Sequence, residues 1–209
     1  MNYIALGFLP FVILFLGLHL WKKPGPVFKT FSTLLCTALA VIGAVQHGGI
    51  AWLVAGSLLI CAVADYVLEK SFIFGTCIFM VAHILLTAYL VINGGQLTWN
   101  LLIALVIVIG TGIVYRKYMF HRKDNVMPVI GVYSCVLATM VAVALNMIEI
   151  ELTPARIIMM IAAVCFTVSD AILGDGVVKG NKTPLKYKIL MVFYNAAVYL
   201  FALSTFYLP

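Results

Sequence analysis

Charged side chains are scarce in this sequence: seven residues are acidic and thirteen are basic among 209, and charged residues make up only 10% of the chain. Soluble domains contain about 25% charged residues and are about half apolar. In this sequence 65% of the residues are hydrophobic, and the mean hydropathy is +1.16. A water-soluble fold has too little interior to bury that much apolar surface. The composition therefore excludes a soluble domain and predicts an integral membrane protein.

Several sequence signatures of common enzymes are also missing. There is no G-x-S-x-G elbow, P-loop, dinucleotide fingerprint or H-E-x-x-H motif, which argues against serine hydrolase, nucleotide and zinc-peptidase chemistry. The five cysteines lie inside apolar runs without a C-x-x-C pair, and of the four histidines only His83 lies deep in such a run. This pattern does not match the ligand spacing of a zinc site. We predict that the protein uses no metal or organic cofactor and binds no nucleic acid.

Eight apolar runs are present, each close to the length of a helix that crosses a bilayer, which is about 20 residues. They cover residues 4–21, 28–46, 50–68, 72–92, 99–115, 126–147, 156–174 and 188–208. The segments between them are too short for a soluble domain, so we expect a single domain over residues 1–209 with antiparallel consecutive helices. No basic residue precedes the first run, which is typical of a retained span and not of a signal peptide. The predicted fold is an all-α bundle of eight transmembrane helices with short loops.

The basic residues predict the orientation of this bundle. Positive residues remain on the cytoplasmic side of a membrane, and twelve of the thirteen fall near the odd-numbered loops, with Arg156 as the exception. The odd-numbered loops should therefore be cytoplasmic, and both termini should lie on the non-cytoplasmic side. The expected location is a bacterial cytoplasmic membrane.

Two acidic residues, Asp65 and Asp170, are predicted to lie inside the membrane. Each is about one helical turn, roughly 6 Å, from the cytoplasmic end of its run, and the two runs have the same direction, so both carboxyls should lie at one depth. A carboxyl in hydrocarbon is costly unless it is paired or hydrated, which makes it a candidate functional group. The alternative is a structural role as a buried hydrogen-bonding group or as a partner of Lys70 or Lys188. A cysteine shortly before each aspartate also favours a weak four-plus-four internal repeat.

Five other polar residues are candidates for the same site. His83 lies near the middle of its run, on a helical stripe that should face the bundle interior; the alternative is a core histidine satisfied by hydrogen bonds. Tyr133, Ser169, Tyr194 and Asn195 also need partners when buried, and each alone can simply bridge helices. Together with two carboxyls they would form a polar pocket, which we expect to open toward the cytoplasmic leaflet.

The order of short motifs along the chain resembles that of the YhhN-like integral membrane proteins, which include the animal lysoplasmalogenases. The matching motifs are Lys23-Pro24, Asp65-x-x-Leu68, Gly75 with Phe79 and Ala82-His83, Pro128-Val129 with Tyr133, and Phe166-x-x-Ser169-Asp170-x-x-Leu173. Each motif is short, but their order and spacing cover nearly the whole chain. Three positions depart from the pattern: Ala64 replaces a glycine, Leu86 a tyrosine and Ala197 a glutamine. These departures put the exact substrate in doubt.

The resemblance implies hydrolysis of the vinyl ether bond of a lysoplasmalogen, which releases a fatty aldehyde and a glycerophospho-ethanolamine or glycerophospho-choline. Asp65 and Asp170 would be catalytic, because one buried carboxyl can donate a proton while the other stays ionised and stabilises the cation. The residues expected to bind the lysophospholipid are His83, Tyr133, Ser169, Tyr194, Asn195 and Lys23. Which aspartate has which role stays open.

Three other functions are compatible with the sequence. A small proton-coupled transporter would also keep carboxyls inside the membrane, although transporters usually have interrupted helices. Another lysolipid hydrolase of the same fold would cleave an ester, amide or phosphodiester. An inactive family member would only bind lipid. The sequence does not predict the oligomeric state.

Overall fold

The computed structural model describes residues 3–21, 26–119, 126–149, 152–181 and 183–208. Within these residues the chain forms eight α-helices, two short 3-10 helices and no strand. The helices are α1 (Tyr3–Trp21), α2 (Pro26–His47), α3 (Ala51–Leu68), α4 (Phe72–Ile92), α5 (Leu101–Met119), α6 (Val126–Asn146), α7 (Pro154–Lys179) and α8 (Pro184–Ser204). The 3-10 helices are Met147–Glu149 and Thr205–Tyr207. The predicted all-helical fold is confirmed.

Seven of the described helices, α2 to α8, are long and apolar enough to cross a membrane. The first helix contributes a shorter apolar stretch, Leu6–Trp21. Such a set of long apolar helices is typical of an integral, multi-pass membrane protein. Large apolar side chains also remain exposed along the outside of the bundle, for example Val106 on α5, which is 70% exposed. In a bilayer these side chains would contact lipid.

The end of α7 differs from the predicted one. The prediction ended this span at residue 174, whereas the helix continues to Lys179 and ends at Gly180, whose φ of 68° is left-handed. Asp175 lies inside the extra turn and forms an ion pair with Lys179 over 2.5 Å. The prediction was wrong because it treated glycine and charge as helix terminators, although membrane helices tolerate glycine. The next helix starts early too, at Pro184, where the Thr183 side chain caps it.

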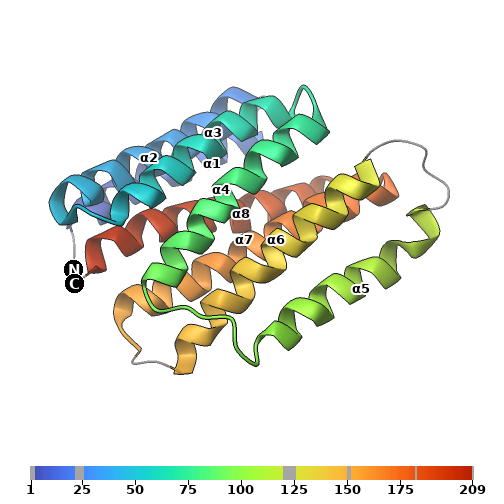
Figure 1. Cartoon of the computed structure of the whole chain (residues 1–209). Coiled ribbons are helices and arrows are strands. Elements are labelled where there is room, and N and C mark those ends of the chain that lie inside the picture. The colour runs from blue at the N-terminus through green and yellow to red at the C-terminus, as the bar shows by residue number, and fades with distance from the viewer. Residues whose placement is uncertain (1–2, 22–25, 120–125, 150–151, 182, 209) are drawn as a thin grey trace.

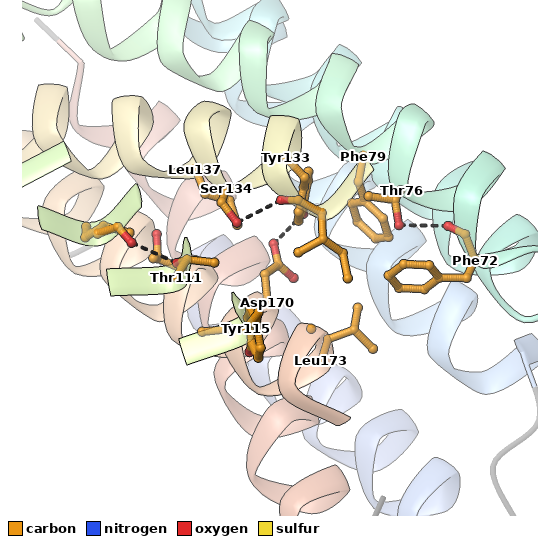
Figure 2. A pocket seen from close by; sticks show the side chains of 15 residues that line it. Phe72, Thr76, Phe79, Thr111, Tyr115, Tyr133, Ser134, Leu137, Asp170 and Leu173 are labelled. Carbon is orange, nitrogen blue, oxygen red and sulfur yellow. Dashed lines mark hydrogen bonds between the residues drawn. The ribbon is translucent and has the colours of Figure 1, made fainter. Parts of the chain in front are cut away.

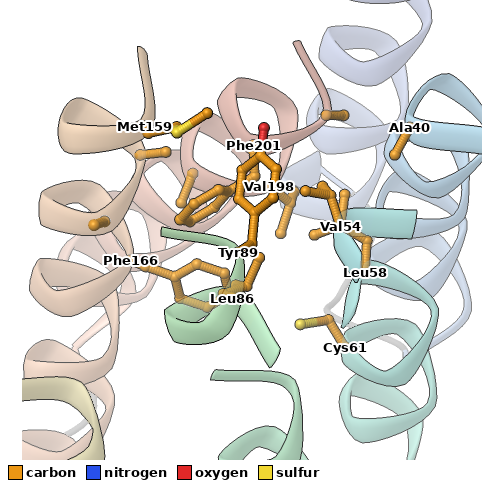
Figure 3. Close-up of a cluster of buried hydrophobic side chains, with 14 of the residues drawn as sticks. Ala40, Val54, Leu58, Cys61, Leu86, Tyr89, Met159, Phe166, Val198 and Phe201 are labelled. Atoms are coloured by element: carbon orange, nitrogen blue, oxygen red, sulfur yellow. The ribbon is translucent and has the colours of Figure 1, made fainter. Parts of the chain in front are cut away.

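The helices pack mainly as sequential antiparallel neighbours, with α8 in contact with α1, α2, α3 and α7 (Figure 1). One core extends from Val12 on α1 to Leu208 near the end of the chain. Figure 3 shows part of it, where Phe166 of α7 and Phe201 of α8 face Leu58 and Leu86 from the other half of the bundle. This packing brings α3 and α7, the helices of the two intramembrane aspartates, toward the same interior.

Helix α5 lies at the edge of the bundle (Figure 1). Its buried residue Ala104 packs against Ala138 and Ala142 of α6, and its contacts with α7 are few. Small residues allow such helices to approach closely in a membrane. Helix α5 is therefore held mainly by α6, and a cavity remains between α5 and α7.

Candidate functional site

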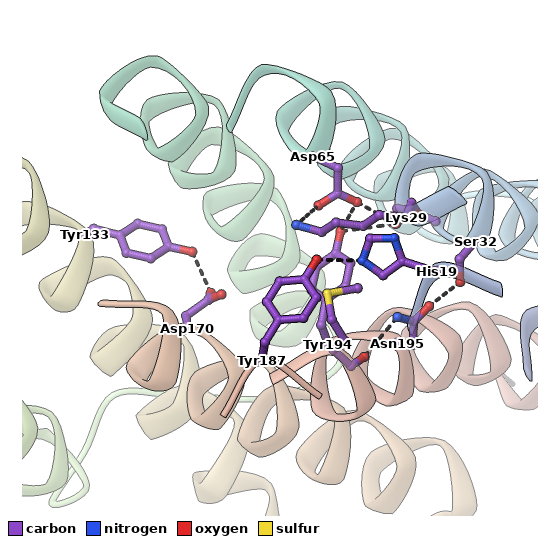
Figure 4. Close-up of polar contacts among 11 residues, drawn as sticks. His19, Lys29, Ser32, Asp65, Tyr133, Asp170, Tyr187, Tyr194 and Asn195 are labelled. Carbon is purple, nitrogen blue, oxygen red and sulfur yellow. Dashed lines mark hydrogen bonds and ion pairs between the residues drawn. The ribbon is translucent and has the colours of Figure 1, made fainter. Parts of the chain in front are cut away.

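Asp65 is the centre of a fully buried polar cluster near the end of α3 (Figure 4). Its Oδ1 lies 2.8 Å from Nζ of Lys29 on α2. Its Oδ2 accepts hydrogen bonds from the hydroxyls of Thr33 at 2.6 Å and Tyr194 at 2.7 Å. The carboxyl therefore has a cationic partner and two donors, which is the environment that a buried carboxylate requires.

The position of Lys29 corrects two expectations from the sequence. Lys29 was counted with the basic loop residues, but it lies in the first turns of α2 and is only 6% exposed. Its ammonium also lies 5.1 Å from the ring centroid of Tyr194. The ion-pair partner of Asp65 is thus Lys29 and not Lys70 or Lys188. A lysine and an aspartate that neutralise each other can both remain inside a membrane helix bundle.

Asp170 is the centre of a second cluster. The hydroxyl of Tyr133 on α6 donates to Oδ2 of Asp170 at 2.5 Å, and Nε2 of His83 on α4 lies 3.4 Å from the same oxygen. His83 Nδ1 donates to the carbonyl of Phe79 at 2.7 Å, since a carbonyl can only accept. That bond leaves Nε2 to face Asp170, although no hydrogen bond joins Nε2 to the carboxyl in this structure. The two groups are close neighbours, and a small shift of either side chain would let them exchange a proton.

Two phenylalanines separate the clusters. The ring of Phe166 lies 4.5 Å from His83 and 5.5 Å from Tyr194, measured between centroids. Phe79 lies 6.2 Å from His83 and 6.1 Å from Tyr194 in the same way. The two carboxyls therefore have separate hydrogen-bond partners on either side of this aromatic wall.

The two aspartates lie at different distances from the ends of their helices. Asp65 is three residues before Leu68, the end of α3, as the sequence predicted. Asp170 is nine residues before Lys179, the end of α7, or about 13 Å at 1.5 Å per residue. The expectation of one turn was wrong for Asp170, because α7 continues through the glycine-containing segment that was read as its end.

A cavity of about 90 Å³ adjoins Asp170 and Tyr133 (Figure 2). It lies between α4, α5, α6 and α7, and it is lined by Phe72, Thr76, Phe79, Ile107, Thr111, Tyr115, Ile130, Tyr133, Ser134, Leu137, Thr167, Asp170, Ala171, Leu173 and Gly174. Because a water molecule occupies about 30 Å³ of liquid, this volume corresponds to a few waters or a small part of a substrate.

The hydroxyl groups in this cavity are oriented as acceptors. Four of them donate their hydrogen to the carbonyl four residues earlier on their own helix; these are Thr76, Thr111, Ser134 and Thr167. Each oxygen keeps lone pairs for a second partner. A cavity with acceptors and one carboxyl is suited to a hydrogen-bond donor such as water.

A larger cavity of about 610 Å³ lies nearby, among α1, α2, α3, α4, α7 and α8. Its lining includes Lys29, Lys186 and Lys188, together with Glu69. The imidazole of His19 and the hydroxyl of Tyr187, which also line it, lie 2.6 Å apart. Phe72 and Leu173 line both this cavity and the one beside Asp170. These two side chains therefore separate the cavity that contains the lysines from the buried carboxyl of Asp170.

The other predicted site residues are placed differently. Ser169 is buried and lines neither cavity. Asn195 accepts a hydrogen bond from Ser32 on α2 and donates to the carbonyl of Met191 at 2.9 Å, so it joins α8 to α2. His83 and Tyr194 are buried contacts of the two aspartates and do not line the cavities. Lys23 lies outside the described residues.

Sequence reasoning missed Lys29 and Thr33 at Asp65, and the hydroxyl residues at Asp170. A signal for the first pair was present, because Lys29 and Thr33 are four residues apart and lie on one helix face. Asp65 on α3 and Tyr194 on α8 are 129 residues apart, with four helices between them in the chain, so their contact needed the tertiary structure. Among the described residues, no three His, Cys, Asp or Glu side chains gather as a potential metal site.

Comparisons with known proteins identify the family. The sequence profile of the YhhN family matches residues 25–205, a span that includes both aspartates and all the lysines of the larger cavity. Neither the curated proteins nor the solved structures contain a significant match. The family match covers most of the chain and agrees with the resemblance seen in its motifs. The chain belongs to the YhhN family.

Proposed function

We propose that this protein is a lysoplasmalogenase-like membrane hydrolase that cleaves the vinyl ether bond of a lysoplasmalogen. Membership of the YhhN family, which is associated with hydrolase activity, supports this proposal. The observation that carries it is the environment of Asp170: a buried carboxyl bonded to Tyr133, facing His83, beside a cavity with acceptor groups. A proton donor next to a water-sized space is what vinyl ether hydrolysis requires.

Asp170 is the proposed proton donor. It transfers its proton to the double-bond carbon farther from the ether oxygen, which forms a C–H bond and leaves an oxocarbenium ion. Water from the adjacent cavity adds to the carbon next to the oxygen and returns a proton to Asp170, giving a hemiacetal. The hemiacetal then breaks its bond to the glycerol oxygen, which takes the hydroxyl proton, and a fatty aldehyde leaves. Tyr133 holds the carboxyl, and His83 can exchange the proton with it.

Asp65 is the proposed ionised partner. Its ion pair with Lys29 and the hydrogen bonds that it accepts from Thr33 and Tyr194 are the contacts that a buried carboxylate needs. It lies behind Phe79 and Phe166, so its effect on the cation is electrostatic and does not require contact with substrate. This arrangement supports the acid role for Asp170 and the charge role for Asp65, which the sequence left open.

The proposal is tested by incubating the purified protein with alkenyl and ester lysolipids of matched chain length and identifying the products by mass spectrometry. Aldehyde from the alkenyl lipid supports it. Fatty acid from the ester lipid, without aldehyde, would favour another lysolipid hydrolase of the same fold.

A proton-coupled transporter is the second candidate, because the Lys29–Asp65 pair lies inside the bundle as relay groups do in pumps. Helices α3 and α7 are continuous through their described lengths, whereas transporters usually bind substrate at interrupted helices. Proton uptake into vesicles without lipid turnover would favour this candidate.

We also propose the membrane topology: one domain over residues 1–209, eight spans, both termini on the non-cytoplasmic side of a bacterial cytoplasmic membrane. The distribution of lysine and arginine supports it. Asn181 and Gln96 are both exposed and lie in loops on opposite sides of this topology. In a variant without native cysteines, Gln96→Cys should react with an impermeant thiol reagent in intact cells, and Asn181→Cys should react only after lysis. The reverse pattern would invert the orientation.

A further inference from the structure

The larger cavity combines positive charge with a volume suited to a small polar group. It measures about 610 Å³. The charged residues in its lining are Lys29, Lys186, Lys188 and Glu69. Ligand pockets commonly measure roughly 300–1,000 Å³. An anion would therefore find space here, together with ammonium groups that can donate hydrogen bonds to it.

The start of α8 adds to the positive potential. Thr183, Pro184, Lys186 and Tyr187 all line the cavity, and they form the first turn of a helix of 21 residues. The amino-terminal end of a helix carries partial positive charge and attracts anions such as phosphate. This first turn contains no acidic residue that would already occupy that position.

Lys29 connects this cavity to the buried charge at Asp65. Its side chain is only 6% exposed, yet it contributes to the lining while its ammonium is 2.8 Å from Asp65. Lys186 similarly lies 3.1 Å from Asp175 on α7. These ion pairs hold two of the cations in place at the cavity wall, so less side-chain entropy is lost when an anion binds.

The two cavities are neighbours that share part of their lining. Phe72 of α4 and Leu173 of α7 line both of them, and Figure 2 shows both side chains beside Asp170. A ligand with an anionic group in the larger cavity would have to pass only Phe72 and Leu173 to reach Asp170. In a lysolipid only the glycerol lies between the phosphate and the bond to the chain.

We infer that the larger cavity is the binding site for the phosphate group of a single-chain lipid, with Lys29, Lys186 and Lys188 as its cations. The site sets the position of the lipid, so that the bond between glycerol and chain reaches Asp170. The identity of the lipid rests on the proposed function, but the phosphate site is tested by binding alone.

The test uses two lipids that the protein cannot hydrolyse. One is a 1-O-alkyl lysophosphocholine, and the other is the 1-O-alkylglycerol with the same chain and no phosphate. Binding to the full-length protein in a neutral maltoside detergent is measured by titration. The wild type should bind the phospholipid at least about tenfold more tightly, as expected for one charge-assisted phosphate contact. Lys188→Met should remove most of this preference and leave the affinity for the alkylglycerol unchanged.

The matched control is Lys70→Met. Lys70 is exposed at the end of α3, stacks on Tyr66 at 4.5 Å and does not line the cavity. This variant loses the same charge and should keep the wild-type preference. Equal effects of Lys188→Met and Lys70→Met would overturn the inference, because they would indicate general surface attraction. Equal affinity of the wild type for both lipids would overturn it too.

Inorganic phosphate and glycerophosphocholine separate the two sources of a phosphate group. Neither should compete with the alkyl lysolipid at concentrations near the dissociation constant of that lipid, since both lack the chain. Competition at equal affinity would show a site for a soluble anion and overturn the lipid assignment. Phosphate-dependent binding without any aldehyde release would leave this inference standing and contradict the proposed reaction.

Discussion

Asp170→Asn should lower the rate of aldehyde release by a factor of about 10² to 10⁴, because removal of a positioned proton donor typically has an effect of that size. The amide cannot transfer a proton to carbon, although it can keep the contact with Tyr133 that the carboxyl makes at 2.5 Å. The variant should fold, since the amide is neutral like the protonated carboxyl that it replaces and has nearly the same size. The rate is measured on purified, monodisperse protein with an alkenyl lysolipid.

Glu149→Gln is the matched control for this substitution. Glu149 accepts hydrogen bonds from Trp99 and from Asn146, and it lies beyond the opposite end of α6 from Tyr133. The same acid-to-amide change there should leave the rate near the wild-type value. Near-normal aldehyde release by folded Asp170→Asn protein would refute the role of Asp170 as the acid.

Lys29→Met should destabilise the protein by about 3–5 kcal/mol, the usual cost of removing one partner of a buried ion pair. The substitution keeps the length of the side chain but leaves the carboxylate of Asp65 buried without its cation at 2.8 Å. Thermal unfolding in detergent should show a clear fall in Tm. Lys70→Met, which removes an exposed lysine, should change Tm very little.

The double variant Lys29→Met with Asp65→Asn should recover most of the lost stability, since neither charge is then left alone. Stability losses that simply add in the double variant would contradict the importance of this ion pair.

This double variant also separates a catalytic role of Asp65 from a structural one. The folded double variant lacks the Asp65 charge but is not weakened by an unpaired lysine. The rate is measured at saturating lipid, because Lys29 is also a proposed phosphate contact. If Asp65 stabilises the oxocarbenium ion, aldehyde release should remain far below the wild-type rate despite normal folding. If Asp65 only holds helices together, the rate should return along with stability.

The sequence predicted the helices well because the bilayer imposes a simple rule. A span needs about 20 apolar residues, and the breaks between spans need polar residues, glycine or proline. The predicted runs 50–68 and 72–92 differ from α3 and α4 by at most one residue at each end. Asp65 and Asp170 could be identified from the sequence as candidate site residues for a similar reason, since acidic residues are rare in hydrocarbon unless they have a function.

Contacts between distant helices could not be predicted in the same way. Lys29 was counted among the basic residues near the loops, because a lysine near the end of an apolar run normally extends its ammonium to the membrane surface. Its burial depends on how α2 packs against α3. The acceptor hydroxyls at Asp170 come from four helices, and in each helix a threonine or serine bonded to its own backbone carries no signal of a shared cavity.

The most direct test of the proposed reaction is hydrolysis of an alkenyl lysolipid in D₂O, followed by mass spectrometry of the aldehyde. If Asp170 protonates the double bond, its exchangeable proton is replaced by deuterium, and the product should carry one deuterium on the carbon next to the aldehyde group. The wild type should form this labelled aldehyde rapidly, and Asp170→Asn should form almost none. A protein that releases only fatty acid from an ester lysolipid, or that forms no aldehyde from the alkenyl lipid while it binds that lipid, would contradict the account.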